Sequence, residues 1–257
     1  PVSSVDGTET DLASAVQTAS DILSSSNLPL LYGLSRSSTP GQRAAIALGD
    51  RLGGMVDTTA SRCHAPSIMA LQQVGESTCS LGEVRQRSDV VVYWGANPLR
   101  SHPRHLERYA GDPEGTFVPR GRADRHIVVV DPNATETAAI ADMHLQITPG
   151  RDFELLWDLR ARLAGLPGDV SPAHGIPAEQ VDAFSERIRT ARYGIVFFGL
   201  GLTRGTVGHQ DVEALLMMVR DAHRHTRWSA RRMRIPGDVA GADSVLCWQT
   251  GFPFSVD

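Results

Sequence analysis

A chain of 257 residues is long enough for one large or two ordinary α/β domains. Its hydrophobic content of 41% and its formal net charge of −4 at pH 7 are typical of a globular protein and give no indication of binding to nucleic acid or to an anionic membrane. The sequence contains no lysine, which excludes chemistry based on a Schiff-base lysine or a phosphate-binding lysine within the chain.

The three cysteines, Cys63, Cys79 and Cys247, lie far apart and form no Cys-x-x-Cys pair. This pattern argues against a disulfide scaffold or a zinc ribbon and favours a reducing compartment. No apolar run reaches the roughly 18 to 20 residues of a membrane span, and no charged-then-apolar signal opens the chain. We therefore expect a cytoplasmic protein without a membrane or nucleic-acid partner, which is either a piece or a short member of a longer family.

Strands and helices are predicted to alternate along the chain. A helix is predicted over residues 11–25 with Asp11 as its cap, and another over residues 40–52, which ends at Gly53. Further helices are predicted over residues 81–84, 153–163, 179–190 and 212–223, and strands over residues 28–32, 55–59, 89–94, 127–130, 194–198, 226–230 and 245–248. The alternation predicts an α/β fold of two doubly wound parallel-sheet lobes, residues 1–163 and 178–257, with a Gly- and Pro-rich linker over residues 164–177.

The stretch over residues 127–152 reads as strand, turn, short helix, strand and turn. Its first four residues are β-branched, as in a buried parallel strand, and the strand ends at Asp131 and Pro132, followed by Thr135. Ligands of open α/β sheets bind outside the carboxyl ends of strands, so these residues are candidates for contacts to a nucleotide. The alternative is an Asp that caps a helix beginning at a proline, which needs no ligand.

Cys63 and His64 follow the predicted strand over residues 55–59. A thiolate is a soft ligand for a transition metal, and an adjacent imidazole can transfer a proton to whatever the metal binds. The alternative is a buried structural thiol, since free cysteine is among the most buried residue types.

Other candidate residues give weaker indications. For His102 and His105, surface or phosphate-facing roles are favoured over metal binding, because no third ligand lies at a recognisable spacing. Gly199 and Gly201 would let a backbone approach a ligand closely, but position 204 is Arg204, so a dinucleotide-binding glycine fingerprint is not met. Two groups of arginines are candidates for binding phosphate or for solvated surface charge. They are Arg120, Arg122 and Arg125, and Arg231, Arg232 and Arg234.

Several segments together resemble a known enzyme family. Three of them, WGANP (residues 94–98), VVDPNATETAAIAD (129–142) and ITPGRDFELL (147–156), are similar in order and spacing to the molybdopterin-dinucleotide oxidoreductases. More narrowly, the chain resembles the B subunits of formylmethanofuran dehydrogenase over nearly its whole length. The segments that carry this likeness are SRCHAPS (61–67), LGEVRQRSDVVVYWGANP (81–98), HPRHLERY (102–109), FFGLGLT (197–203) and WQTGFPFSVD (248–257).

The resemblance implies a tungsten or molybdenum ion held by two pterin guanine dinucleotides and one protein thiolate, which interconverts carbon dioxide and formate for transfer to methanofuran in a multi-subunit complex. It implies that Cys63 binds the metal, that His64 transfers a proton and that Arg234 neutralises a bound formate. The residues that match the family's pterin-nucleotide pocket are Gly95, Asn97, Asp131, Pro132, Thr135, Asp142, Gly150 and Asp152, with Gly199 and Gly201 as further candidates.

The chain also departs from that family. Redox-active relatives carry four cysteines for an iron–sulfur cluster, and this sequence has no such set. The alternative function is therefore a metal-free scaffold subunit, similar to the B subunit of the bacterial formyltransferase/hydrolase complex. A third interpretation is a nucleotide-binding domain unrelated to metals, as in the central domain of thiamine-dependent enzymes.

Overall fold

The computed structural model describes residues 2–166, 172–205, 207–234 and 239–256. These residues form two compact units. One unit contains the described residues up to His64 together with those from Val239 onward, and the other contains those between Ala65 and Arg234. The chain therefore leaves the first unit, builds the second, and returns to the first.

The second unit is built on a sheet of five parallel strands in the order β7-β6-β5-β8-β9. The strands are β5 (Val90–Trp94), β6 (His126–Val130), β7 (Met143–Leu145), β8 (Tyr193–Phe198) and β9 (Arg227–Arg232). All residues of β5 and β8 are buried, which explains their unbroken apolar sequences, VVVYW and YGIVFF. Strand order reverses between β5 and β8, and such a switch point is where open α/β sheets bind ligands.

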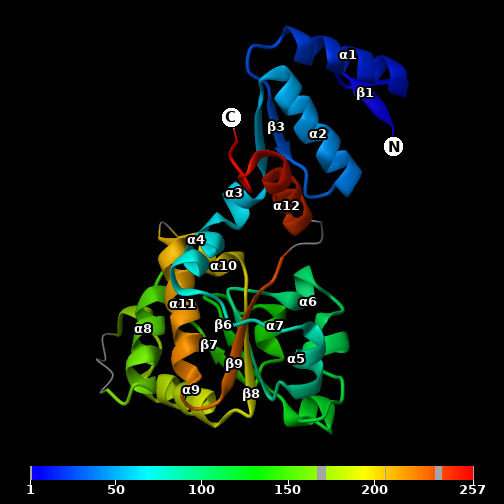
Figure 1. The fold of residues 1–257 in the computed structure, drawn as a ribbon. Helices are drawn as coiled ribbons and strands as arrows, with labels where there is room; N and C mark the ends of the chain where they lie inside the picture. Colours follow the sequence, from blue (N-terminus) through cyan, green and yellow to red (C-terminus); the bar gives the residue numbers. More distant parts are fainter. Residues whose placement is uncertain (1, 167–171, 206, 235–238, 257) are drawn as a thin grey trace. The chain divides into compact units, whose positions relative to one another are not determined.

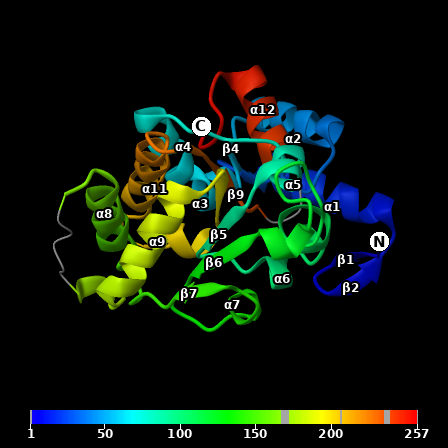
Figure 2. The ribbon, with the colours of Figure 1, turned by 90° about the horizontal axis from the view of Figure 1, so that it is seen from below.

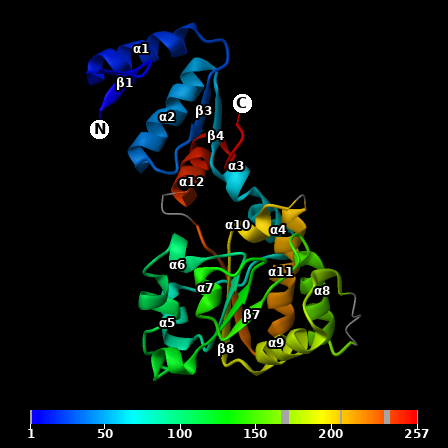
Figure 3. The same ribbon diagram turned by 180° about the vertical axis from the view of Figure 1, so that it is seen from behind.

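Helices cover both faces of this sheet (Figures 2 and 3). One face is packed by α4 (Ala65–Val74), α8 (Asp152–Leu163), α9 (Ala178–Thr190) and α11 (Gly208–Ala222). The other is packed by α5 (Leu81–Arg87), a π-helical turn (Leu106–Ala110) and α7 (Glu136–Ala139). The remaining short elements are α6 (Pro98–Ser101), α10 (Leu200–Thr203) and two 3-10 turns, Gly121–Asp124 and Pro172–His174.

The first unit contains two small sheets (Figure 1). In one, β1 (Ser3–Val5) pairs with β2 (Thr8–Thr10), and in the other, β3 (Leu30–Gly33) lies parallel to β4 (Met55–Thr58). The helices are α1 (Leu12–Ser25), α2 (Thr39–Leu52), α3 (Ala60–Cys63) and α12 (Val239–Thr250). Ile46, Val56, Val245 and Leu246 form the core of this unit, so the end of the chain supplies half of it.

Local sequence explains several boundaries. The side chain of Ser80 accepts a hydrogen bond from Glu83 N at 3.1 Å, and the carboxylate of Glu83 accepts one from Ser80 N at 2.9 Å, which starts α5 with a capping box. Helix α2 begins after Ser38 with a proline in its first turn and ends at Gly53, whose φ of 62° suits glycine.

Among the described residues, no helix combines the length and the apolar character that a membrane span requires.

Two sequence-based expectations differ from the structure. The strand predicted over residues 245–248 is wrong, because these residues lie in α12. Val239, Ala242, Val245 and Leu246 are buried at helical spacing, whereas Trp248 is 73% exposed. In addition, the five-stranded sheet takes strands from both sides of the predicted linker over residues 164–177, so the division into units does not coincide with lobes of residues 1–163 and 178–257. Residues 167–171 of that linker lie outside the described ranges.

Candidate functional site

Three predicted site glycines meet at the switch point of the five-stranded sheet. Gly95 follows β5 with a φ of 54°, and Gly199 and Gly201 follow β8. Gly201 N donates to the carbonyl of Gly95 at 3.0 Å. A Cβ built on Gly95 would lie 2.7 Å from Leu202 N, and one on Gly201 would lie 2.6 Å from the Cα of Gly95. These glycines are thus required for the close approach of two loops at this edge.

Polar side chains of the same edge hold the loop after β5 to α7. Asn97 donates through Nδ2 to Glu136 at 2.5 Å and accepts through Oδ1 from the hydroxyl of Thr137 at 2.7 Å. The hydroxyl of Thr135 accepts from Ala138 N at 3.1 Å and caps α7. Asp131 is not the helix cap, because its Oδ1 accepts from Asn133 N at 2.8 Å in a turn before the helix. Pro132 lies between Asp131 and Asn133 in this turn.

Asp152 begins α8 at this edge, two residues after Gly150, whose φ of 74° makes the turn into the helix. Its carboxylate accepts a hydrogen bond from Trp94 Nε1 at 2.7 Å. Burial raises the pKa of Asp152, and the nearby carboxylates of Asp131 and Glu154 add to the increase. A ligand group with N–H donors would relieve this crowding of negative charge.

Asp211 was not found by sequence reasoning. It lies in the first turn of α11, is only 7% exposed, and has a pKa raised to about 6 by burial and by the charges of Asp152 and Glu154. An acidic residue in a first helical turn is common, so the sequence held no signal that separated it from a solvated charge.

Asp142 lies at the opposite edge. Its carboxylate accepts from Ile127 N, near the amino end of β6, at 2.7 Å and pairs with Arg122 at 3.0 Å. Arg125, which is 3% exposed, uses its guanidinium to bind the backbone carbonyls of Gly111, Pro113 and Arg85. The structure therefore separates Asp142 from the other predicted nucleotide-binding residues.

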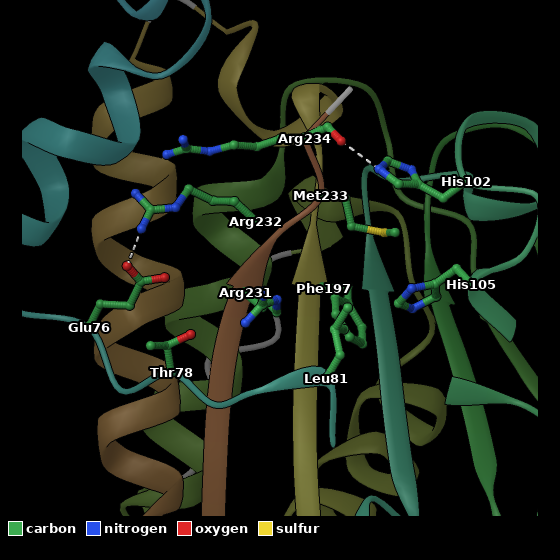
Figure 4. A pocket seen from close by; sticks show the side chains of 10 residues that line it. All are labelled: Glu76, Thr78, Leu81, His102, His105, Phe197, Arg231, Arg232, Met233 and Arg234. Carbon is green, nitrogen blue, oxygen red and sulfur yellow. Dashed lines mark hydrogen bonds and ion pairs between the residues drawn. The ribbon is translucent and has the colours of Figure 1, made fainter. Parts of the chain in front are cut away.

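A cavity of about 420 Å³ lies at the carboxyl-terminal ends of β8 and β9 (Figure 4). It is lined by Glu76, Thr78, Leu81, His102, His105, Phe197, Arg231, Arg232, Met233 and Arg234. The side chain of Arg232 forms an ion pair with Glu76. Burial raises the pKa of Glu76, although Arg232, Arg234 and Arg231 oppose the increase. With three arginines and one carboxylate, the lining carries a net formal charge of +2 if both histidines are neutral, so the cavity favours anions.

His102 joins two segments of the cavity wall. Its Nδ1 lies 2.8 Å from the hydroxyl of Ser101, and its Nε2 lies 2.5 Å from the backbone oxygen of Arg234. Because a carbonyl oxygen only accepts, the Nε2 of His102 carries the proton. The segment after β5 thereby holds the backbone of Arg234 in place.

Cys63 and His64 belong to the other unit. Cys63 is the last residue of α3, which starts directly after β4, and its side chain is partly exposed. His64 is 5% exposed, and its backbone N–H donates to Ala60 at 2.8 Å. Among the described residues, no group of three or more His, Cys, Asp or Glu side chains is arranged to hold a metal ion. A metal that arrives with a cofactor would need only one protein ligand, and the side chain of Cys63 is of a type that serves as one.

The comparisons with known proteins agree with the resemblance predicted from sequence segments. The chain is 38% identical over 247 residues to the B subunit of a tungsten-containing formylmethanofuran dehydrogenase from Methanocaldococcus jannaschii, covering 96% of this chain and 57% of the relative. It is 26% identical over 249 residues to the B subunit of the formyltransferase/hydrolase complex of Methylorubrum extorquens, covering 96% of this chain and 63% of the relative. No protein-family model matches the chain.

The fold gives the same relationship. The solved formyltransferase/hydrolase complex of Methylorubrum extorquens, determined with methylofuran, matches with a TM-score of 0.72 and 25% identity over 97% of this chain and 65% of that chain. The chain spans about three fifths of the length of the curated relatives that it matches. By sequence and by fold, the chain is similar to the B subunits of formylmethanofuran dehydrogenase and of the formyltransferase/hydrolase complex.

Proposed function

We propose that the chain acts as the B-type subunit of a formylmethanofuran dehydrogenase, in one-carbon metabolism on methanofuran or an analogue. The proposal rests on the 38% identity to a formylmethanofuran dehydrogenase B subunit over 96% of the chain. Within its own unit each candidate segment follows a parallel strand: Cys63 and His64 lie at the end of α3, which follows β4, and Arg234 lies two residues after β9. Parallel strands present their ligand-binding residues at these carboxyl ends. The relative from Methanocaldococcus jannaschii is named as tungsten-containing, which supports the same assignment.

Each of the three side chains has a distinct chemical role in this proposal. The thiolate of Cys63 is the protein ligand of a tungsten or molybdenum ion that two pterin guanine dinucleotides would bring, and this group would supply the electrons for the interconversion of carbon dioxide and formate. The guanidinium of Arg234 neutralises the carboxylate of formate, and its backbone is held by His102. The imidazole of His64 transfers the proton that the reaction consumes or releases.

The edge of the sheet in the second unit is the proposed site for one pterin nucleotide. Asp131, Asp152 and Thr135 offer acceptors there, and the buried carboxylate of Asp152 suits an N–H-rich base such as guanine. Gly95 and Gly199 keep the loops close together. We further propose that the two units are parts of two α/β lobes of the molybdopterin oxidoreductase type.

The second candidate function is a metal-free scaffold subunit of a formyltransferase/hydrolase complex. The TM-score of 0.72 to such a complex over 97% of the chain favours it. Under either function the partners are the other subunits of a multi-subunit complex.

Metal analysis of the native complex tests the choice. Tungsten or molybdenum at about one atom per chain is expected for the enzyme, and Cys63→Ser should abolish it. Cys247→Ser is the matched control, because Cys247 is exposed on α12. Equal metal content in wild type and Cys63→Ser would refute the ligand assignment, and metal at background level in the wild type would refute the metal-dependent function.

A further inference from the structure

The residues of β9 and the two that follow it alternate between two sides of the strand (Figure 4). Arg232 and Arg234 lie on one side, where Arg232 meets Glu76. Arg231 and Met233 lie on the other side, towards His105 and Phe197. Because successive side chains of a strand point to opposite faces, Arg231 and Arg234 do not contact the same small ligand. The cavity therefore contains a second cationic side that the proposed function does not use.

Arg231 has unused hydrogen-bonding capacity. One guanidinium nitrogen donates to the backbone oxygen of Cys79 at 2.5 Å, and no carboxylate among the described residues forms an ion pair with Arg231. A guanidinium has five N–H donors, so most of them remain for water or a ligand. Register places Arg231 opposite Phe197 of β8, and Phe197 lies between Arg231 and His105 in the close view.

His105 is the second polar group on this side. It is 7% exposed, and its Nε2 is buried without a hydrogen-bond partner in the part of the chain that the structure describes. Its ring packs edge-on against Phe197 at 4.6 Å and against Tyr93 at 5.9 Å between centroids. Burial lowers the pKa of His105 to about 4, and the charges of His102 and Arg231 contribute, so the imidazole is neutral at pH 7.

A buried imidazole nitrogen without a partner costs free energy, which a ligand in the cavity would recover. Arg231 pairs only with acceptors, so a ligand that reaches both residues presents oxygen atoms. The walls formed by Leu81, Phe197 and Met233 are apolar, and low polarity around an ion pair strengthens it. A negative charge of one is sufficient, because a single uncompensated guanidinium faces this side.

We infer that Arg231 and His105 form a binding subsite for a small carboxylate, in which one oxygen accepts from the guanidinium of Arg231 and the other from Nε2–H of His105. The subsite needs neither a metal nor Arg234. It is therefore independent of the redox function proposed above and is expected in the scaffold as well.

Formate and acetate are the probes, titrated into the full chain at constant ionic strength with chloride as the balancing anion. The imidazole signals of His105 should shift and saturate in ¹⁵N-histidine NMR spectra. Bound carboxylate should also raise the pKa of His105, because a nearby anion favours the protonated imidazole. The groups that face His105 are Arg231, His102, Tyr93 and Tyr109, and none of these is a carboxylate that could produce the same effect.

Variants separate the subsite from its surroundings. Arg231→Gln and His105→Phe should each weaken formate binding at least tenfold, while the phenyl ring keeps the aromatic packing. Arg227→Gln, at the exposed start of β9, should bind formate as the wild type does. Absence of a saturable shift, or wild-type binding by Arg231→Gln, would overturn the inference. If both site variants fail to fold, the effect of formate on the pKa of His105 in the wild type decides the question.

Discussion

Replacement of Gly194 by alanine should destabilise the second unit strongly. Gly194 lies in β8 directly opposite Trp228 of β9, and a Cβ at Gly194 would overlap three atoms of the indole ring. Trp228 is fully buried, and its Nε1 donates to the carbonyl of Ile188 at 2.9 Å. The ring therefore has to move, which overpacks the core at about 1–3 kcal/mol and loses a buried hydrogen bond of about 1 kcal/mol. The free energy of unfolding should fall by about 2–4 kcal/mol.

Urea unfolding followed by circular dichroism measures the effect, and the midpoint should drop by about 1 M. Gly82→Ala is the matched control, because Gly82 is exposed in α5 and its added methyl group would meet only Ser80 Oγ at 3.6 Å. That change should stabilise by about 0.5–1 kcal/mol through helix propensity. Trp228→Leu in the Gly194→Ala background should cost less than the sum of the single changes. A Gly194→Ala variant within about 0.5 kcal/mol of the wild type, the usual error of additivity, would refute the packing argument.

Three further outcomes are expected. Because the pKa of Asp211 is raised to about 6 in the folded state, its contribution to stability falls as pH rises from about 4 to 6, so Asp211→Asn should gain stability relative to the wild type at pH 7 but not at pH 4 in urea unfolding. Arg125→Ala should lower the free energy of unfolding by about 3 kcal/mol or more, because three backbone carbonyls lose their charged donor, and an unchanged urea midpoint would contradict this. Trp94→Phe should raise the pKa of Asp152 further, since a donor to its carboxylate is removed, and NMR titration of that carboxyl group tests it.

The sequence predicted most strands and helices of the second unit because their signals are local. An unbroken apolar run such as residues 90–94 is sufficient for a buried parallel strand, and the cap at Ser80 is sufficient for the start of α5. The strand predicted within α12 was wrong because four apolar residues follow one another at 245–248, a pattern that is also typical of a strand. Only Val245 and Leu246 are buried, on one face of the helix, whereas Cys247 and Trp248 are exposed. The return of this helix to the first unit depends on contacts with α2, which no local pattern encodes.

The candidate site was predictable only where position along a strand decides its geometry. Residues directly after a strand, such as Asp131 and Gly95, do lie at the carboxyl edge. Asp142 precedes β7, and a residue before a parallel strand lies at the amino edge, so its pairing with Ile127 follows from chain direction. The partnership of Arg231 and His105 required the register of β8 and β9 together with the packing of the π-helical turn, and neither leaves a sequence signal.

Side chains at the end of β9 alternate between two separate proposed sites, one for catalysis and one for a carboxylate. The proposed catalytic role rests on Arg234 and Cys63, whereas the carboxylate subsite rests on Arg231 and His105, and the two arginines point to opposite sides of one strand. A shift of β9 by a single residue would exchange the two sides. The hydrogen bonds from Met233 N to the backbone oxygen of Phe198 at 2.8 Å and from His102 Nε2 to the backbone oxygen of Arg234 hold the present register, and with it the directions of both arginine side chains. Loss of the proposed metal ligand Cys63 would therefore leave the proposed carboxylate subsite of Arg231 and His105 intact, so formate binding at His105 is expected in the Cys63→Ser variant as well.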